Sequence, residues 1–235
     1  MAEVMLIVPH PDDEVFSCGG LFTKMAVHGR CAVTVTLTRG GSGRNLGVCH
    51  PDELGSVRER ELKASLDVLG VRHSHLFDFP DGELKRLPEA ELVEAIVPLI
   101  EQYRPRAVVT FPPNGSNGHP DHVATNRAAS SALRQADHEA EAVYYFAADR
   151  PVRIDARPGW LSPEEVYAGF LPATHYLDVQ PYIENKIRAM GQHETQARSV
   201  LMFMRRFPRR LMHEAFHRAH PPYPEDVGPV TVEWL

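Results

Sequence analysis

Histidine and acidic side chains are concentrated at two places far apart in the chain. Residues 10–14 (HPDDE) come just after the apolar run 4–8, and residues 118–122 (GHPDH) come a few residues after the apolar run 107–111. Imidazole and carboxylate groups together suit zinc, whose catalytic sites use three protein ligands and leave one position open for water. The competing interpretation is two helix N-caps, since aspartate is a good capping residue. A cap needs one acid and the first cluster holds three, but this cluster alone fits a cap and a metal site equally well. Two such clusters in one crevice would favour metal binding over two coincidental caps, with groups to spare for acid–base work.

The elements around these clusters predict an α/β fold with a doubly wound, mostly parallel, Rossmann-like sheet and an elaborated C-terminal segment. Apolar and β-branched runs predict strands at 4–8, 32–38, 75–79, 107–111, 143–147 and 174–179. Helical spacing predicts helices at 16–28, 51–69, 89–103 (interrupted or bent near Pro98), 120–134 and 182–198. Steady alternation of strand and helix implies right-handed crossovers and a parallel sheet. Strands one and four then lie side by side where the strand order reverses, so both clusters are expected in one crevice.

The length of 235 residues and the hydrophobic content of 43% fit a single domain over 1–235. We expect a Rossmann-like core at 1–150 and a C-terminal elaboration at 151–235, most of it irregular after the last predicted helix. The densest basic cluster, at 205–206 and 209–210, is interpreted as the solvated face of a helix. Because the net charge is −6, a nucleic-acid partner or a membrane surface is not expected.

The sequence also predicts a cytoplasmic location. Cys18, Cys31 and Cys49 form no CxxC pair and leave an odd count, which argues for a reducing compartment. The start of the chain lacks the basic and long apolar regions of a signal peptide, and no apolar run approaches ~20 residues. The thiol of Cys18 lies close enough in sequence to the first cluster to be a possible ligand, but packing of the first helix is the favoured role.

The two clusters together resemble the signature blocks of the LmbE-like, or PIG-L, N-acetylglucosaminyl deacetylase family, and most closely its thiol-cofactor branches. The paired spacing is the specific part of this resemblance, which covers most of residues 4–200. Further matching segments are 18–20 (CGG), 37–43 (LTRGGSG), Arg58 and Glu61, 69–71 (LGV), 81–82 (DG), 113–115 (PNG), and Lys186, His193 and Gln196. Gly41 departs from the pattern, because that loop often carries a glutamate in the family.

The resemblance implies a metal-dependent deacetylase with His10, Asp13 and His122 as the metal ligands. The cofactor would be Zn²⁺, although Fe²⁺ or another divalent ion also accepts imidazole and carboxylate ligands. A metal-bound water would be the nucleophile, and Asp12 would be the general base. A protonated His119 would stabilise the tetrahedral intermediate.

The remaining roles also come from the resemblance. Asp121 would orient or tune His119, and either Asp12 or His119 could protonate the leaving amine. Four residues would contact the substrate: Arg58, Asp81, Asn114 and His193.

The expected substrate is a small N-acetylated sugar conjugate, such as the GlcNAc-malate intermediate of bacillithiol synthesis. A thiol-conjugate amidase and a chitooligosaccharide deacetylase of the same fold are the enzyme alternatives. A non-catalytic sugar- or metal-binding module is the alternative from another class, and the presence of both Asp12 and His119 argues against it. A homo-oligomer is compatible with the resemblance.

A rival motif lies near the end of the chain. Residues 213–217 (HEAFH) match the HExxH pattern of zinc metalloproteases, with Glu214 as the base and His220 as a further candidate ligand. The motif lies in a tail expected to be irregular, with no other candidate ligand nearby, and it competes with two clusters that further family-like segments support. We therefore prefer the two-cluster site.

Overall fold

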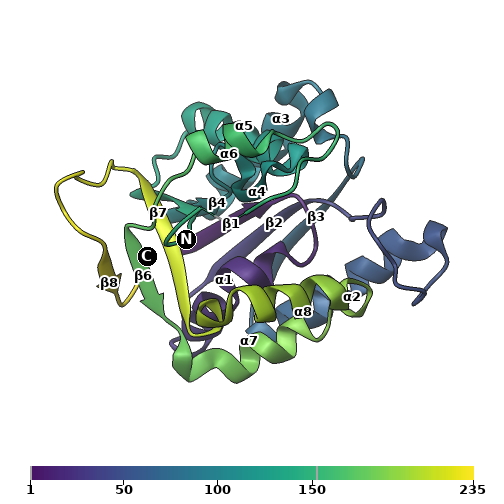
Figure 1. Ribbon diagram of the computed structural model, residues 1–235. Helices are drawn as coiled ribbons and strands as arrows, with labels where there is room; N and C mark the ends of the chain where they lie inside the picture. Colours follow the sequence, from purple (N-terminus) through teal and green to yellow (C-terminus); the bar gives the residue numbers. More distant parts are fainter. Residues whose placement is uncertain (1, 152) are drawn as a thin grey trace.

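One eight-stranded sheet forms the centre of the computed structural model, which describes residues 2–151 and 153–235. Its strand order is β3-β2-β1-β4-β5-β7-β6-β8 (Figure 1). The first five strands in sequence run parallel, and β7 runs antiparallel to both of its neighbours. The strands are β1 Val4–Val8, β2 Ala32–Thr38, β3 His73–Phe79, β4 Ala107–Thr110, β5 Ala142–Phe146, β6 His175–Asp178, β7 His213–His220 and β8 Val230–Val232. The predicted doubly wound, mostly parallel α/β fold is confirmed.

Helices cover both faces of this sheet (Figure 1). On one face lie α1 Asp13–Val27, α2 Leu54–Leu69, α7 Ile183–Met190 and α8 Ala197–Arg206. On the other lie α3 Glu89–Tyr103 and α5 Pro120–Gln135. The short helix α4 Gly115–Gly118 packs against α5, and α6 Pro163–Ala168 packs against α4. Single 3₁₀ turns occupy Pro51–Glu53, Leu84–Arg86, Gln180–Tyr182, Glu194–Gln196 and Pro208–Leu211. No helix in the described part of the chain is both long and apolar enough to cross a bilayer.

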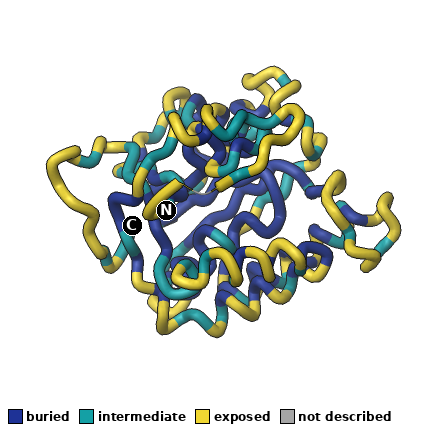
Figure 2. The backbone as a smooth tube through the Cα atoms, viewed as in Figure 1, coloured by how far each residue is buried: buried dark blue, intermediate teal, exposed yellow. Residues whose placement is uncertain are grey.

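Strand β1 divides the core in two. Leu6 and Val8 pack into the apolar cluster under α1 and α2, whereas Met5 and Ile7 pack into the cluster under α3 and α5. Every residue of β1 is buried, as expected for a continuous apolar run in a parallel sheet, and Figure 2 shows the central strands in the colour of buried residues. Because β1 pairs directly with β4, the strand order reverses between them.

The C-terminal third differs most from the sequence-based expectations. The predicted helix at 182–198 is two helices, because the chain turns at Gly191 and directs His193 into the interior. Helix α3 continues without interruption through Pro98. The region expected to be irregular contains β7, which inserts between β5 and β6.

The basic cluster is also only partly as expected. Arg205 and Arg206 are exposed in the last turn of α8, as expected. The helix ends at Arg206, and Arg209 and Arg210 lie in the next 3₁₀ turn. The Nε atom of Arg210 is buried rather than solvated.

A buried ion pair joins this C-terminal part to the core. Lys186 on α7 donates from Nζ to Oε1 of Glu214 at 2.6 Å, and both side chains are almost completely buried. The same carboxylate accepts the backbone N–H groups of Gly20 and Leu21 in α1, at 2.8 and 2.9 Å. Strand β7 is thereby held against the helix that begins in the first histidine–aspartate cluster.

Gly20 is required for this close approach of α1 to the C-terminal part. A Cβ atom at position 20 would lie 2.4 Å from Cβ of Val179. We expect Gly20→Ala to lower the free energy of unfolding by about 1–3 kcal/mol, because the overpacking cost outweighs the higher helix propensity of alanine. Urea denaturation measures the change. The control is Gly228→Ala, whose Cβ meets no described atom within 4 Å; equal stability of the two variants would contradict the predicted clash.

Candidate active site

Three potential metal ligands meet where the strand order reverses. His10 follows β1, Asp13 begins α1 and His122 lies in the first turn of α5. Each residue offers one ligand atom, and these atoms lie within 4.8 Å of one another. His10 Nδ1 is 3.4 Å from Asp13 Oδ2, and His122 Nε2 is 3.9 Å from Asp13 Oδ1. The two clusters singled out in the sequence therefore form one site.

The ring of His122 is held in one orientation. Its Nδ1 lies 3.0 Å from the carbonyl oxygen of Gly115, and its face stacks on Phe111 at 3.8 Å between ring centroids. When Nδ1–H donates to this carbonyl, Nε2 keeps its lone pair for a cation. Such a second hydrogen bond is the usual way in which proteins fix a ligating histidine. Phe111 was not singled out in the sequence, although it directly follows β4.

Carboxylates surround His10 on both sides of its ring. Nδ1 faces Asp13, while Nε2 lies 3.2 Å from both Asp81 and Asp121. Burial lowers the pKa of His10, but hydrogen bonds to Asp121, Asp13 and Asp81 outweigh it and raise the pKa well above its usual value. A cluster with this excess of negative charge favours a cation, whether a proton or a metal ion.

The carboxylate of Asp121 serves mainly to fix the loops. It accepts the backbone N–H groups of Gly82 and Leu84 at 2.7 and 3.1 Å, in addition to its contact with His10. Asp121 and Asp81 thus lie against His10, whereas the sequence analysis placed Asp121 beside His119 and Asp81 against the substrate.

His119 occupies the N-cap of α5. Its Nδ1 accepts the backbone N–H of Asp121 at 3.1 Å, and its ring stacks on His122 with centroids 4.7 Å apart. Burial, followed by the nearby rings of His122 and His10, lowers the pKa of His119 to about 3. This pKa favours a neutral ring, whereas the sequence analysis predicted a protonated His119. A neutral ring that accepts at Nδ1 carries its proton on Nε2, where it can donate.

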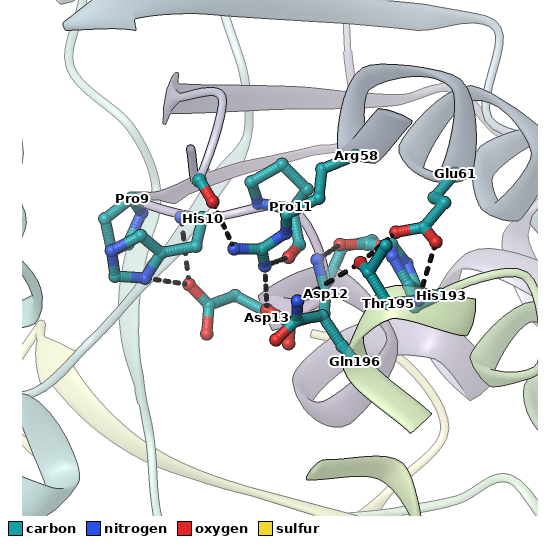
Figure 3. Close-up of polar contacts among 12 residues, drawn as sticks. Pro9, His10, Pro11, Asp12, Asp13, Arg58, Glu61, His193, Thr195 and Gln196 are labelled. Carbon is teal, nitrogen blue, oxygen red and sulfur yellow. Dashed lines mark hydrogen bonds and ion pairs between the residues drawn. The ribbon is translucent and has the colours of Figure 1, made fainter. Parts of the chain in front are cut away.

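Asp12 has an unusual backbone conformation. It sits at the N-cap of α1 with φ 106°, in the left-handed region that non-glycine residues rarely adopt, and its side chain forms no capping hydrogen bond. Arg58 Nη2 pairs with its Oδ1 at 3.2 Å and also donates to the carbonyl of Pro11 (Figure 3). Burial raises the pKa of Asp12 to about 7 against the opposing effect of Arg58, and Asp13 adds to the rise. A carboxyl group with this pKa can exchange a proton near neutrality.

Glu14 fixes the backbone of Asp12 from the interior. Its Oε2 accepts the Asp12 N–H at 2.9 Å, and its Oε1 accepts from Ser65 Oγ at 2.8 Å and His193 Nε2 at 2.7 Å. Burial would raise the pKa of Glu14, but His193 outweighs it and lowers the pKa. Glu14 in turn raises the pKa of His193 against the effect of burial. The two form a buried ion pair. The sequence analysis missed this role, because it treated Glu14 only as one of the three acids in the first cluster.

Three residues expected to contact substrate are packed into the protein. His193 has 0% exposure beside Glu14, and Arg58 lies beneath the loop at 10–13 with 4% exposure. Arg58 Nη1 also donates to Gly40 O, and Gly40 has a φ of 67°, a left-handed backbone conformation that favours glycine. Asn114 donates from Nδ2 to the carbonyls of Val166 and Gly169. Through their described contacts, all three position the loops of the site.

A known family matches more than half of the chain. The family described as GlcNAc-PI de-N-acetylase, PIG-L, matches residues 5–133, which include both clusters. The chain belongs to this family. The matched part of the PIG-L domain runs from β1 into α5 and holds the three potential ligands.

Curated relatives extend this similarity beyond the PIG-L match. A 1D-myo-inositol 2-acetamido-2-deoxy-alpha-D-glucopyranoside deacetylase from Mycobacterium sp. (strain KMS) is 31% identical over 226 residues, covering 82% of this chain and 73% of the relative. The enzyme of the same name from Rhodococcus erythropolis is 30% identical and covers 82% of this chain and 80% of that one.

Solved structures share the fold at lower sequence identity. The N,N'-diacetylchitobiose deacetylase from Pyrococcus horikoshii superposes with a TM-score of 0.69 at 19% identity, covering 95% of this chain and 88% of that one. GalB, the 4-carboxy-2-hydroxymuconate hydratase from Pseudomonas putida KT2440, superposes with a TM-score of 0.70 at 18% identity, covering 97% and 100%. Because the second of these is named as a hydratase, the fold alone does not identify the reaction.

The rival HExxH motif is ruled out by its secondary structure. His213 and His217 lie on strand β7, not on a helix. Glu214 is 1% exposed and forms the ion pair with Lys186, so it is not available as a base. The ring of His217 points to another partner, since its Nδ1 lies 2.9 Å from the carbonyl oxygen of Pro172.

The pair of Glu14 and His193 gives a test of this site. We expect Glu14→Ala to lower the free energy of unfolding by about 3–5 kcal/mol, because it leaves His193 as an uncompensated buried charge. Urea denaturation measures the loss. Glu94→Ala, an exposed glutamate of α3, is the matched control and should change stability by less than about 0.5 kcal/mol. Equal stability of the two variants would show that the buried pair is not ionised.

Proposed function

We propose that this protein is a metal-dependent hydrolase that removes the acetyl group from an N-acetylglucosaminyl conjugate, releasing acetate and a free amine. The observation that carries this proposal is the meeting of His10, Asp13 and His122 around one point, with Asp12 and His119 beside them. Family membership and two deacetylase relatives at 30% identity or above support it.

His10, Asp13 and His122 would hold the ion, and their chemistry fits zinc. Two imidazoles and one carboxylate make up a common ligand set of catalytic zinc sites. Fe²⁺ accepts the same ligands, so the identity of the metal is a matter for measurement. When bound, the ion would supply Lewis acidity, polarise the acetamide carbonyl and lower the pKa of a water to roughly 7.

The remaining groups then divide the proton transfers. Asp12, with a pKa of about 7, accepts the proton of the attacking water and can return it to the leaving amine. His119, neutral and with its Nδ1 already bound to the Asp121 N–H, donates from Nε2 to the oxyanion of the tetrahedral intermediate. Arg58, Glu14 and His193 keep Asp12 in place without touching the reacting atoms.

The identity of the conjugate attached to the acetylated sugar is the more specific part of the proposal. GlcNAc-malate and the inositol glycoside named in the mycobacterial relative are both small N-acetylglucosaminides. A panel of GlcNAc-malate, the GlcNAc-inositol conjugate and N,N'-diacetylchitobiose, followed by acetate release, would rank them. Because a hydratase shares this fold, an assay for the hydration of 4-carboxy-2-hydroxymuconate is a useful negative control.

Asp12→Asn is the direct test of the base. We expect it to retain the metal but to lower kcat by about 10²–10⁴-fold, since that is the usual contribution of a positioned acid–base group. Metal content by plasma mass spectrometry and acetate release measure the two effects. Unchanged turnover in the metal-loaded variant would remove Asp12 from this role.

The ligand set is tested by removing one of its members. His122→Ala should lose bound metal and acetate release together, because the two remaining ligands do not complete the site. The matched control is His217→Ala on β7, which should keep both. Full metal occupancy in His122→Ala, or metal loss in His217→Ala, would contradict the proposed centre.

A further inference from the structure

A tryptophan from the C-terminal third contacts the side chain assigned above as the oxyanion donor. The indole of Trp160 lies edge-on to the ring of His119, with 4.4 Å between the ring centroids. Trp160 is half-buried and comes from the connection between β5 and β6, a segment expected only to elaborate the core. Edge-on aromatic pairs at this spacing attract each other, so the contact restrains both rings.

The turn that carries Trp160 is closed by its own contacts. The Trp160 N–H donates to the carbonyl of Arg157 at 3.2 Å, and Gly159 has a φ of 79°, which glycine adopts without strain. The guanidinium of Arg157 lies 4.4 Å from the centre of the indole ring. From the segment after β3, Lys85 Nζ donates to the carbonyl of Gly159 at 2.7 Å. The indole is thus held by its own turn, and the turn is held by a neighbouring segment.

The same turn is docked on the loop after β4, which leads into α5. The Leu161 N–H donates to the carbonyl of Gly118 at 3.0 Å. Asn114 Nδ2 donates to the carbonyl of Val166 at 2.9 Å and so ties α6 to this loop, in agreement with the packing of α6 against α4 (Figure 1). Backbone contacts on both sides therefore determine where Trp160 lies.

Trp160 completes the set of contacts that orient His119. The Nδ1 atom of His119 accepts the Asp121 N–H at 3.1 Å, its face stacks on His122 at 4.7 Å, and His10 lies edge-on at 5.0 Å. A single hydrogen bond leaves an imidazole able to tilt about that bond, and the close indole limits the tilt. An oxyanion donor acts only within about 2.7–3.1 Å of the developing charge, so a small tilt would weaken the bond from Nε2.

We propose that Trp160 is a positioning residue for His119, which holds the imidazole so that its Nε2–H points to the oxyanion of the tetrahedral intermediate. Trp160 acts through His119 and not by contact with the reacting atoms. This inference rests on the proposed deacetylase function and adds to it a residue outside the two histidine–aspartate clusters.

Removal of the indole tests the role. We expect Trp160→Ala to lower kcat by about 10–100-fold, with KM changed by less than about twofold, because the orientation of the donor matters in the transition state. Trp160→Phe keeps an aromatic edge and should retain kcat within about threefold of the wild-type value. The control Trp234→Ala removes a half-buried tryptophan that packs on Lys24 and Arg30 at the opposite end of α1, and it should keep kcat.

A double-mutant cycle distinguishes positioning of His119 from a general structural effect. Trp160→Ala should change kcat by less than about twofold in the His119→Ala protein, since the group that it orients is already absent. Acetate release from the conjugate that ranks first in the substrate panel gives kcat, expressed per bound metal. Trp160→Leu keeps apolar volume without a ring, and it replaces Trp160→Ala in the cycle, with the same expected loss, if that variant does not fold.

Three results would overturn the proposal. They are an unchanged kcat in Trp160→Ala, a loss confined to KM, and an equal loss of kcat from Trp160→Ala in the wild-type and His119→Ala proteins. Failure of the proposed function has a different signature, namely no acetate release by the wild-type protein from any member of the panel.

The ring of His119 then decides the outcome by itself. Long-range ¹H–¹⁵N spectra of the zinc-loaded protein report the tautomer of each histidine, and His119→Gln assigns the signal. We expect one Nε2–H tautomer in the wild-type protein and in Trp160→Phe, and a mixture of both tautomers in Trp160→Ala. A mixture in the wild-type protein, or the same single tautomer in Trp160→Ala, would show that Trp160 does not orient this ring.

Discussion

The burial of several carboxylates at one edge of the sheet is the constraint on which this structure depends. Asp12, Asp13 and Glu14 are consecutive and each is less than 10% exposed. Desolvated carboxylates of this kind are stable only when other groups compensate their charge. Each has its own partner: Arg58 for Asp12, the rings of His10 and His122 for Asp13, and His193 for Glu14. Much of the surrounding architecture supplies these partners.

The charged groups of this cluster and their partners differ in how deeply they are buried. Glu14 and His193 are fully buried and hold the loop, whereas Asp12 and His119 are closer to the surface and have pKa values of about 7 and about 3. Two groups with such different affinities for protons can act as base and neutral donor in one site. The fixed inner layer also explains how Asp12 maintains a left-handed backbone, since its N–H is bound by Glu14 and the preceding carbonyl by Arg58.

The C-terminal third, which follows the Rossmann-like core in sequence, supplies buried residues that complete the site. His193 reaches Glu14 only because the chain turns between α7 and α8, and Thr195 ties the same turn to Glu61 of α2 through its N–H at 2.7 Å. The buried Lys186–Glu214 pair then holds β7 against α1. Segments expected only to elaborate the C-terminal end of the core therefore contribute an interior partner of the first cluster, His193, and hold it in place.

The sequence alone determined the parallel sheet, the neighbouring positions of β1 and β4, and the identity of the two clusters that meet there. These features follow from local periodicity and from the general rule that strand order reverses at a ligand site, so no side-chain detail is needed. It could not determine which nitrogen of His10 faces which carboxylate, that burial lowers the pKa of His119, or that Arg58, Asn114 and His193 are turned inward. Those properties depend on burial and on partners more than a hundred residues away, as between Glu14 and His193. Strand β7 was missed for the same reason: Glu214 breaks its apolar pattern and is stabilised only by Lys186, which the fold brings to it.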